Sequence, residues 1–243
     1  MIFSNIEFYY TNPELISSDN IIITGDEAKH LAKVMRHSVN DEIYVTDGMG
    51  NVYKSVIKNI TKQEVVSKIE EIYHQENKLN GITFCIPILK ASNRFEFALE
   101  KSVELGITNF LIFSAVKSYK RGIKLDRWER IVISAMKQSL HAYKPEIEFA
   151  ADIRESVPEQ AQTIIFEQTS KISFQDYFIN ENKIKLLQKG NTFFLFGPEG
   201  GLTKEEIDSF NNAKLMSLNE NRLRSETAII TAAALLANLF KII

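Results

Sequence analysis

The sequence of 243 residues contains a single cysteine, Cys85, and four histidines that are scattered along the chain. One cysteine excludes an intrachain disulfide and a cysteine-rich zinc site, and the histidines lack the spacing of metal ligands. We therefore expect no metal cofactor. Cys85 stands in the apolar run Ile82–Leu89 and is expected to be a buried core residue.

The chain also lacks a long uninterrupted apolar segment. Its longest apolar stretch, Ala228–Phe240, contains Thr231 and Asn238 and is too short to cross a bilayer. The first ten residues do not combine a basic segment with a long apolar core, as a secretory signal peptide does. With 44% apolar and 25% charged residues, the composition predicts one large or two small globular domains, no membrane partner and a cytoplasmic location.

Positive charge is not in excess, because the formal net charge is −2. Any contact with nucleic acid must therefore come from local clusters of cations. The first basic patch consists of Lys29, His30, Lys33 and Arg36, and the second consists of Lys117, Lys120, Arg121 and Lys124. A solvated surface without a partner is the alternative for each patch.

Hydrophobic patterning divides the chain into two parts. Short strand-like runs separated by turn signals predict a small β-rich domain over residues 1–72. Its expected strands cover 21–24, 42–46, 52–57 and 64–69, and its expected helix covers 27–35 with Gly25-Asp26 as turn and N-cap. The polar segment 73–81 is the expected linker.

From Ile82 onward strands and helices alternate, which predicts an α/β domain with a mostly parallel sheet over residues 82–243. The expected strands cover 82–89, 108–113, 163–166, 192–196 and 215–218. The expected helices cover 92–105 and 126–141, and a last helix runs to Phe240.

The stretch most typical of a binding site lies between Phe193 and Ala228. A strand-length run ends in Gly197-Pro198-Glu199-Gly200-Gly201, and Thr203 with Glu206 then predicts a capping box at a helix start. Glycine lets the backbone take unusual conformations and lets a ligand approach closely. A strand, a glycine loop and a helix N-terminus together expose backbone N–H groups to a ligand. A tight turn without a ligand is the alternative.

A second loop, Asn219–Arg222, leads into Leu223-Arg224-Ser225-Glu226-Thr227-Ala228. Ser225 or Thr227 is expected to cap the last helix. Neither loop has the Walker A pattern or the G-x-G-x-x-G pattern, which argues against a P-loop or a dinucleotide-binding Rossmann site.

The two motifs, GPEGG with T-x-E-E-I and then LRSETA about two dozen residues later, resemble the RsmE family of the SPOUT superfamily. Four further segments are similar to the family pattern: His30–Arg36, Asp41–Tyr53, Glu100–Ile107, and Gln138-Ser139 followed by Pro145-Glu146-Ile147. The family consists of S-adenosylmethionine-dependent methyltransferases that modify N3 of a uridine in 16S ribosomal RNA. The resemblance implies a C-terminal SPOUT-type α/β domain with a trefoil knot, an N-terminal PUA-like β-barrel that binds RNA, and a homodimer.

The chain departs from the family pattern at five positions. Leu140 and His141 stand where many members have glycine and arginine. Asn219, Asn221 and Arg222 stand where the family has glycine, arginine and an aliphatic residue. Asparagine tolerates the left-handed conformation better than most residues, so Asn219 is expected to preserve the loop.

The resemblance implies S-adenosylmethionine as cofactor and 16S ribosomal RNA, or the small ribosomal subunit, as partner. The expected donor-binding residues are Phe196, Gly197, Pro198, Glu199, Gly200, Gly201, Leu218, Asn219, Leu223, Arg224, Ser225, Thr227 and Ala228. Both basic patches are expected to bind RNA. Arg224 and Glu226 are the predicted catalytic residues, because the proton on N3 must leave during the reaction; a salt bridge at the helix start is the alternative.

Two other functions stay open from the sequence. One is a non-catalytic RNA-binding protein that kept the SPOUT fold, with Asn219–Arg222 marking a degraded donor pocket. The other is a SPOUT enzyme that acts on a different RNA.

Overall fold

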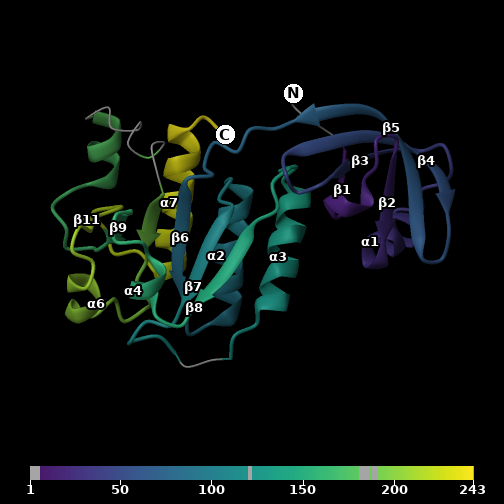
Figure 1. Cartoon of the computed structure of the whole chain (residues 1–243). Helices are drawn as coiled ribbons and strands as arrows, with labels where there is room; N and C mark the ends of the chain where they lie inside the picture. The colour runs from purple at the N-terminus through teal and green to yellow at the C-terminus, as the bar shows by residue number, and fades with distance from the viewer. Residues whose placement is uncertain (1–5, 120–121, 181–186, 188–190, 243) are drawn as a thin grey trace. The chain divides into compact units, whose positions relative to one another are not determined.

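The computed structural model describes residues 6–119, 122–180, 187 and 191–242. Lys120 and Arg121 of the second basic patch lie outside these residues. The chain forms two compact units, with Met1–Asn77 and Ile133–Lys144 in unit 1 and Lys78–Val132 and Pro145–Ile243 in unit 2 (Figure 1). Within the described part of the chain, no helix has the length and apolar character needed to cross a membrane.

Unit 1 is built on a curled five-stranded sheet with the strand order β1-β3-β4-β5-β2 (Figure 1). The strands are β1 (Phe8–Tyr10), β2 (Asn20–Thr24), β3 (Glu42–Thr46), β4 (Asn51–Ile60) and β5 (Glu64–His74). Alternate residues such as Ile21, Ile23 and Val45 face one core, as strand periodicity predicts. Two features were not expected: β1 pairs in parallel with β3, and β5 continues to His74 into the segment predicted as linker.

The helix of unit 1 begins earlier than expected. Helix α1 (Gly25–Lys29) has Thr24 as N-cap, so the predicted cap at Gly25-Asp26 is wrong. It continues into a π-helical turn, η2 (His30–Val34), and the chain then turns through Arg36 in the left-handed region, with φ of 58°. A short 3-10 helix, η1 (Pro13–Leu15), precedes β2.

Residues 133–144 belong to unit 1 through the C-terminal half of α3 (Leu125–Gln138). The ammonium group of Lys137 lies 2.6 Å from a carboxylate oxygen of Glu27. The helix ends three residues earlier than expected, because Leu140 adopts φ of 58°. The family pattern has glycine at this position, and glycine takes that conformation without the steric cost that a side chain brings.

Unit 2 is built on a six-stranded sheet with the order β11-β9-β10-β6-β7-β8, and every pair is parallel. The strands are β6 (Ile82–Pro87), β7 (Asn109–Phe113), β8 (Glu146–Ala150), β9 (Gln162–Phe166), β10 (Thr192–Leu195) and β11 (Lys214–Met216). The predicted α/β class with a parallel sheet is therefore confirmed, although β8 was not expected. Strand β10 lies between β6 and β9, and this insertion shapes the site described below.

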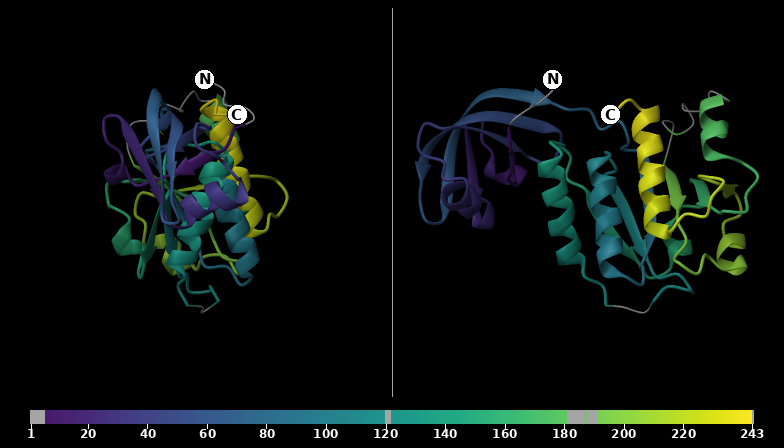
Figure 2. Two further views of the ribbon diagram at one scale, coloured as in Figure 1. Left: turned by 90° about the vertical axis from the view of Figure 1, so that its right-hand side faces the viewer. Right: turned by 180° about the vertical axis from the view of Figure 1, so that it is seen from behind.

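Helices cover both faces of this sheet. On one face, α2 (Ser92–Glu104) and α7 (Ser225–Leu239) lie side by side (Figure 2). On the other, α4 (Ile153–Ser156) contributes Ile153 to a core with Cys85, and Ile207 of α6 (Lys204–Asp208) packs against it. Cys85 is fully buried, as expected, and burial raises the pKa of its thiol. A further π-helical turn, η3, covers Asp176–Asn180.

Candidate functional site

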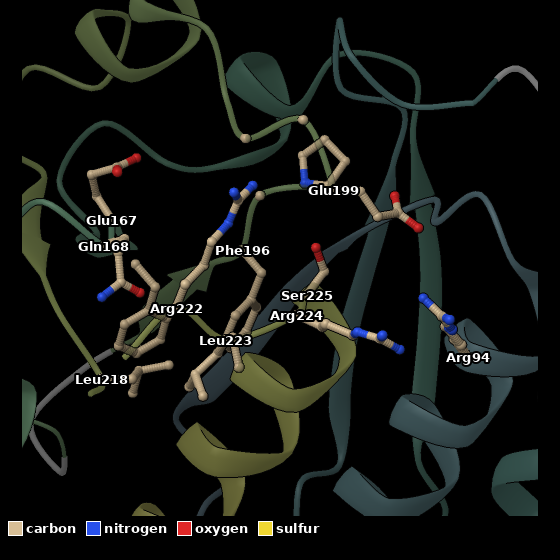
Figure 3. A pocket seen from close by; sticks show the side chains of 16 residues that line it. Arg94, Glu167, Gln168, Phe196, Glu199, Leu218, Arg222, Leu223, Arg224 and Ser225 are labelled. Atoms are coloured by element: carbon tan, nitrogen blue, oxygen red, sulfur yellow. The ribbon is translucent and has the colours of Figure 1, made fainter. Parts of the chain in front are cut away.

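A cavity of about 610 Å³ lies at the carboxyl ends of β9, β10 and β11 in unit 2 (Figure 3). Parallel sheets bind ligands at their carboxyl edge, next to the point where the strand order reverses. Here β6 leads to β7 and β8 on one side, whereas β10, β9 and β11 lie on the other. The cavity therefore occupies the position at which this architecture binds ligands.

The glycine loop, Gly197–Gly201, forms one wall of the cavity. The N–H of Gly201 donates to the carbonyl of Pro198 at 2.8 Å, and Gly201 has φ of +70°. A Cβ at Gly197 would lie only 3.3 Å from Gly201 Cα and from Leu202 N. The loop is thus folded so tightly on itself that a side chain at its first residue would require the backbone around Gly201 to give by a few tenths of an ångström.

Two carboxylates hold this loop in place. Glu199 lines the cavity, and its Oε1 also accepts a hydrogen bond from the backbone N–H of Lys90 at 3.0 Å. The predicted capping box follows: the Thr203 hydroxyl accepts from Glu206 N at 3.2 Å, and Glu206 Oε2 accepts from Thr203 N at 2.7 Å. The glycine loop is therefore fixed at its middle and at its exit into α6.

The second loop is supported by a residue that the sequence did not single out. Gln168 Nε2 donates to the carbonyls of Asn219 and Glu220, at 3.2 and 3.0 Å. Asn219 is not in the left-handed region, so the loop does not need the glycine of the family pattern there. Helix α7 begins at Ser225 with Arg224 as N-cap and without a side-chain cap bond. The expectation that Ser225 or Thr227 caps this helix is wrong.

The cavity brings together most of the expected donor-binding residues. All of them line it except Asn219 and Thr227. Five lining residues were not predicted: Arg94, Phe166, Glu167, Gln168 and Arg222. Three of these directly end or follow β9, so the rule that ligands bind at strand carboxyl ends could have found them.

The two predicted catalytic residues occupy different places. Arg224 lines the cavity, and Figure 3 shows its side chain on the same side as that of Arg94. Glu226 does not line the cavity, but its Oε1 lies 3.5 Å from Arg94 Nε. The Glu226 side chain is only 12% exposed, and its Oε2 is buried without a hydrogen-bond partner among the described residues. An unsatisfied buried carboxylate oxygen is costly, which marks Glu226 as an acceptor open to a further donor.

Glu226 also borders a groove of about 720 Å³ along α7. The groove is lined by Phe97, Gln175, Glu226, Thr227, Ile230, Thr231, Ala234, Leu235 and Asn238. The small residues Ala232, Ala233 and Ala237 are fully buried instead, on the helix that packs against α2. Helix α7 therefore buries these three alanines and leaves a partly apolar face, which includes Ala234, along the groove.

The first basic patch is exposed on unit 1, on α1, η2 and the turn that follows them. The ammonium group of Lys29 lies 2.9 Å from Asp26, which offsets part of its charge. In the second patch, Lys117 lies against the glycine loop: a Cβ at Gly200 would be 3.1 Å from Lys117 Cβ. Lys124 is exposed just before α3. No cluster of potential metal ligands occurs in the part of the chain that the structure describes.

Comparison with families of known proteins gives two matches along the chain. Residues 75–237 match the RNA methyltransferase domain family, and residues 23–70 match the RNA methyltransferase PUA domain family. The chain belongs to the RNA methyltransferase family. This RNA methyltransferase is 27% identical over 233 residues to the Ribosomal RNA small subunit methyltransferase E of Rickettsia conorii, covering 93% of this chain and 92% of that protein. The protein of the same name from Mesomycoplasma hyopneumoniae is 31% identical over 183 residues, covering 72% and 76%.

A solved structure supports the same family. It is the Ribosomal RNA small subunit methyltransferase E of Neisseria gonorrhoeae bound to S-adenosyl methionine, with a TM-score of 0.81 and 28% sequence identity. The match covers 97% of this methyltransferase and 98% of that chain. The resemblance to the RsmE family is thereby confirmed, and so is the assignment of unit 1 as PUA-like.

Proposed function

We propose that this protein transfers a methyl group from S-adenosylmethionine to N3 of a uridine in the 16S ribosomal RNA of the small subunit, in the cytoplasm. The observation that carries the proposal is the cavity at the carboxyl edge of the parallel sheet, because both motif loops line it. In the proposed division, residues 1–72 bind RNA, 73–81 link, and 82–243 carry the methyltransferase site with the trefoil knot of the SPOUT superfamily.

The cavity fits a donor that is held mainly by backbone groups. The backbone of Gly201 and Leu202 lies only 3.3 Å from the Cβ position of Gly197, so the loop backbone itself forms the wall and presents its N–H and C=O groups. Gln168 fixes the carbonyls of the opposite loop. S-adenosylmethionine supplies an electrophilic methyl group, and its displacement by a nitrogen requires little from the protein beyond close alignment. The residues that line the cavity supply that alignment.

The reaction must also remove the proton from N3 of the uridine. Arg224 lines the cavity and would stabilise the uridine anion. Glu226 does not line the cavity, so as the proposed proton acceptor it would have to turn its buried oxygen, which has no partner among the described residues, towards the uridine. Arg94, 3.5 Å from the other oxygen of Glu226, would orient the carboxylate. Both basic patches would neutralise RNA phosphates, since such contacts provide most of the sequence-independent affinity.

We also propose that two copies of the chain form a symmetric homodimer through the partly apolar face of α7 along the groove. An α-helix that is apolar on most sides is normally covered on most sides, and the groove leaves Ile230, Ala234 and Leu235 accessible. Light scattering at micromolar concentration tests the dimer: we expect twice the chain mass for the wild type and a monomer for Leu235→Glu. The exposed Ile72, on β5 of unit 1, provides the control Ile72→Glu. A monomeric wild type would refute the dimer.

The activity is tested with small ribosomal subunits from a strain that lacks this protein. Incubation with labelled S-adenosylmethionine should transfer label to 16S RNA, and mass spectrometry should identify N3-methyluridine. Methylation of another RNA would favour the SPOUT enzyme with a different target. Failure to bind the donor in calorimetry would instead favour the non-catalytic RNA-binding protein.

A further inference from the structure

The segment that follows β7, residues 114–119, forms a compact turn that we name the β7 loop. Ser118 N donates to the carbonyl of Ala115 at 2.9 Å, and Ala115 N donates to the Ser118 hydroxyl at 3.1 Å. These two bonds fix the turn internally. The loop nevertheless exposes large side chains, since Val116 is 74% and Tyr119 is 54% exposed. An ordered backbone that exposes apolar and aromatic groups beside a cation, Lys117, is suited to hold an unstacked nucleotide.

A single carboxylate ties this loop to the donor loop. Glu206 Oε1 accepts a hydrogen bond from Val116 N at 2.8 Å, while Glu206 Oε2 accepts from Thr203 N at 2.7 Å. Thr203 follows the glycine loop after one residue. The two oxygens therefore connect the turn after β7 with the exit of the glycine loop after β10.

A second contact brings the same two loops together. The side chain of Lys117 lies over the glycine loop, because a Cβ at Gly200 would be 3.1 Å from Lys117 Cβ and 3.2 Å from its Cδ. The pKa of Glu205 agrees with this position of Lys117. Hydrogen bonds from its own N–H and from the Thr203 hydroxyl lower the pKa of its carboxyl, and the charge of Lys117 lowers it further. The side chain of Lys117 thus lies against Gly200, which lines the donor cavity.

We propose that the β7 loop holds the acceptor nucleotide next to the donor's methyl group, and that Glu206 is the positioning residue that fixes the distance between them. This inference rests on the proposed function. Methyl transfer forms the bond from the acceptor nitrogen to carbon as the sulfur–carbon bond breaks, so the rate depends on the separation and alignment of the two substrates. A misplacement of about 1 Å can reduce such a rate on the order of 100-fold. Glu206 touches neither substrate and acts only through the two loops.

A carboxylate is required at Glu206 because two N–H groups point at it. Each of its oxygens accepts one of them, whereas the amide of glutamine has a single acceptor oxygen. Glu206→Gln therefore keeps the shape of the side chain and removes one bond of the bridge. Thr203→Ala is the matched control, since it removes the other half of the capping box and leaves both bonds of Glu206 possible.

The experiment compares wild type, Glu206→Gln and Thr203→Ala by steady-state kinetics with small ribosomal subunits and by donor calorimetry. We expect kcat to fall at least about tenfold in Glu206→Gln, with the donor Kd within about threefold of wild type. Thr203→Ala should lower the midpoint temperature of unfolding by a few degrees and keep its kcat. Hydrogen exchange should show faster exchange of the Val116 amide or of the Thr203 amide in Glu206→Gln.

Equal kcat values for the two variants would overturn the proposal, since Glu206 would then act only as a helix cap. Unchanged exchange rates of both the Val116 and the Thr203 amides in Glu206→Gln would also overturn it. If the wild type itself methylated no RNA, the proposed function would fail together with this inference. If the wild type methylated RNA and the two variants could not be distinguished, only the proposed role of Glu206 would be refuted.

Discussion

Gly197 offers the sharpest test of the donor site. The change Gly197→Ala adds one methyl group, which would lie 3.3 Å from both Gly201 Cα and Leu202 N. Both neighbours are backbone atoms, so the glycine loop itself must give by a few tenths of an ångström. Overpacking of this kind costs about 1–3 kcal/mol. A loss of about 1.4 kcal/mol in the donor-bound state corresponds to tenfold weaker binding, and we expect at least that loss for S-adenosylmethionine.

Three other glycines provide comparisons for the effect expected at Gly197. At Gly200 the new methyl group would lie 3.1 Å from Lys117 Cβ and 3.2 Å from its Cδ. Because Lys117 Cβ is fixed to the backbone of the β7 loop, that loop must shift slightly, and Gly200→Ala should weaken donor binding by about threefold, less than Gly197→Ala. At Gly201 there is open space, but φ is +70°. Gly201→Ala should therefore lower the free energy of unfolding by about 1–2 kcal/mol through backbone strain. Gly122 has no atom within 4 Å of its Cβ position and serves as the neutral control.

Isothermal calorimetry measures the donor Kd of each variant, and thermal unfolding verifies that each is folded. We expect the largest loss of affinity for Gly197→Ala, a smaller loss for Gly200→Ala and none for Gly122→Ala. If folded Gly197→Ala bound the donor as tightly as Gly122→Ala, the cavity would not be the donor site.

Three other outcomes are expected. Replacing the lysines of either basic patch by alanine should reduce the salt dependence of RNA binding by about one unit of slope for each phosphate that is no longer neutralised; identical slopes would show that the patches are only solvated surface. Gln168→Ala should weaken donor binding about fivefold, roughly 1 kcal/mol, because the carbonyls of the second loop lose their donor, whereas Gln63→Ala in an exposed turn should not; equal calorimetric affinities would contradict this. The Arg154 side chain lowers the pKa of Asp152 from 3.8 to about 2, so its stabilisation is present above about pH 4 and disappears as the pH falls towards 2. The difference in urea unfolding between wild type and Asp152→Asn should follow that course, and a difference that persists at pH 2 would contradict it.

Structural features that depend only on residues close together in the chain could be predicted from the sequence. The capping box of Thr203 and Glu206 spans four consecutive residues, and the strands of both units follow local periodicity. The start of α7 was misjudged, because Ser225 has the right chemistry for a cap but is the first helical residue. Propensity identifies a residue type that suits a cap, whereas the surrounding packing decides which residue takes the position.

The cavity wall formed by Arg94, Glu167 and Gln168 was not predicted. Glu167 and Gln168 follow β9, so the rule for strand carboxyl ends could have found them, whereas Arg94 is brought to the site only by the strand order. Chain order places β7 after β6, yet the second neighbour of β6 is β10. No local pattern specifies such an insertion. The effect of the departure at Asn219 also depended on the fold: its carbonyl is held by Gln168, and its backbone does not need the freedom of glycine.

The insertion of β10 between β6 and β9 also determines when unit 2 can become stable. Strand β10 pairs Leu195 with Cys85 on one side and with Ile165 on the other. A nascent chain that ends before Thr192 would therefore have β6 and β9 without their shared neighbour, each with an unpaired edge. Closing contacts over such long loops is slow, and unpaired edges can bind other chains. Folding of this unit must wait until most of the protein has been synthesised, whereas the strands of unit 1 are all available within the first 74 residues.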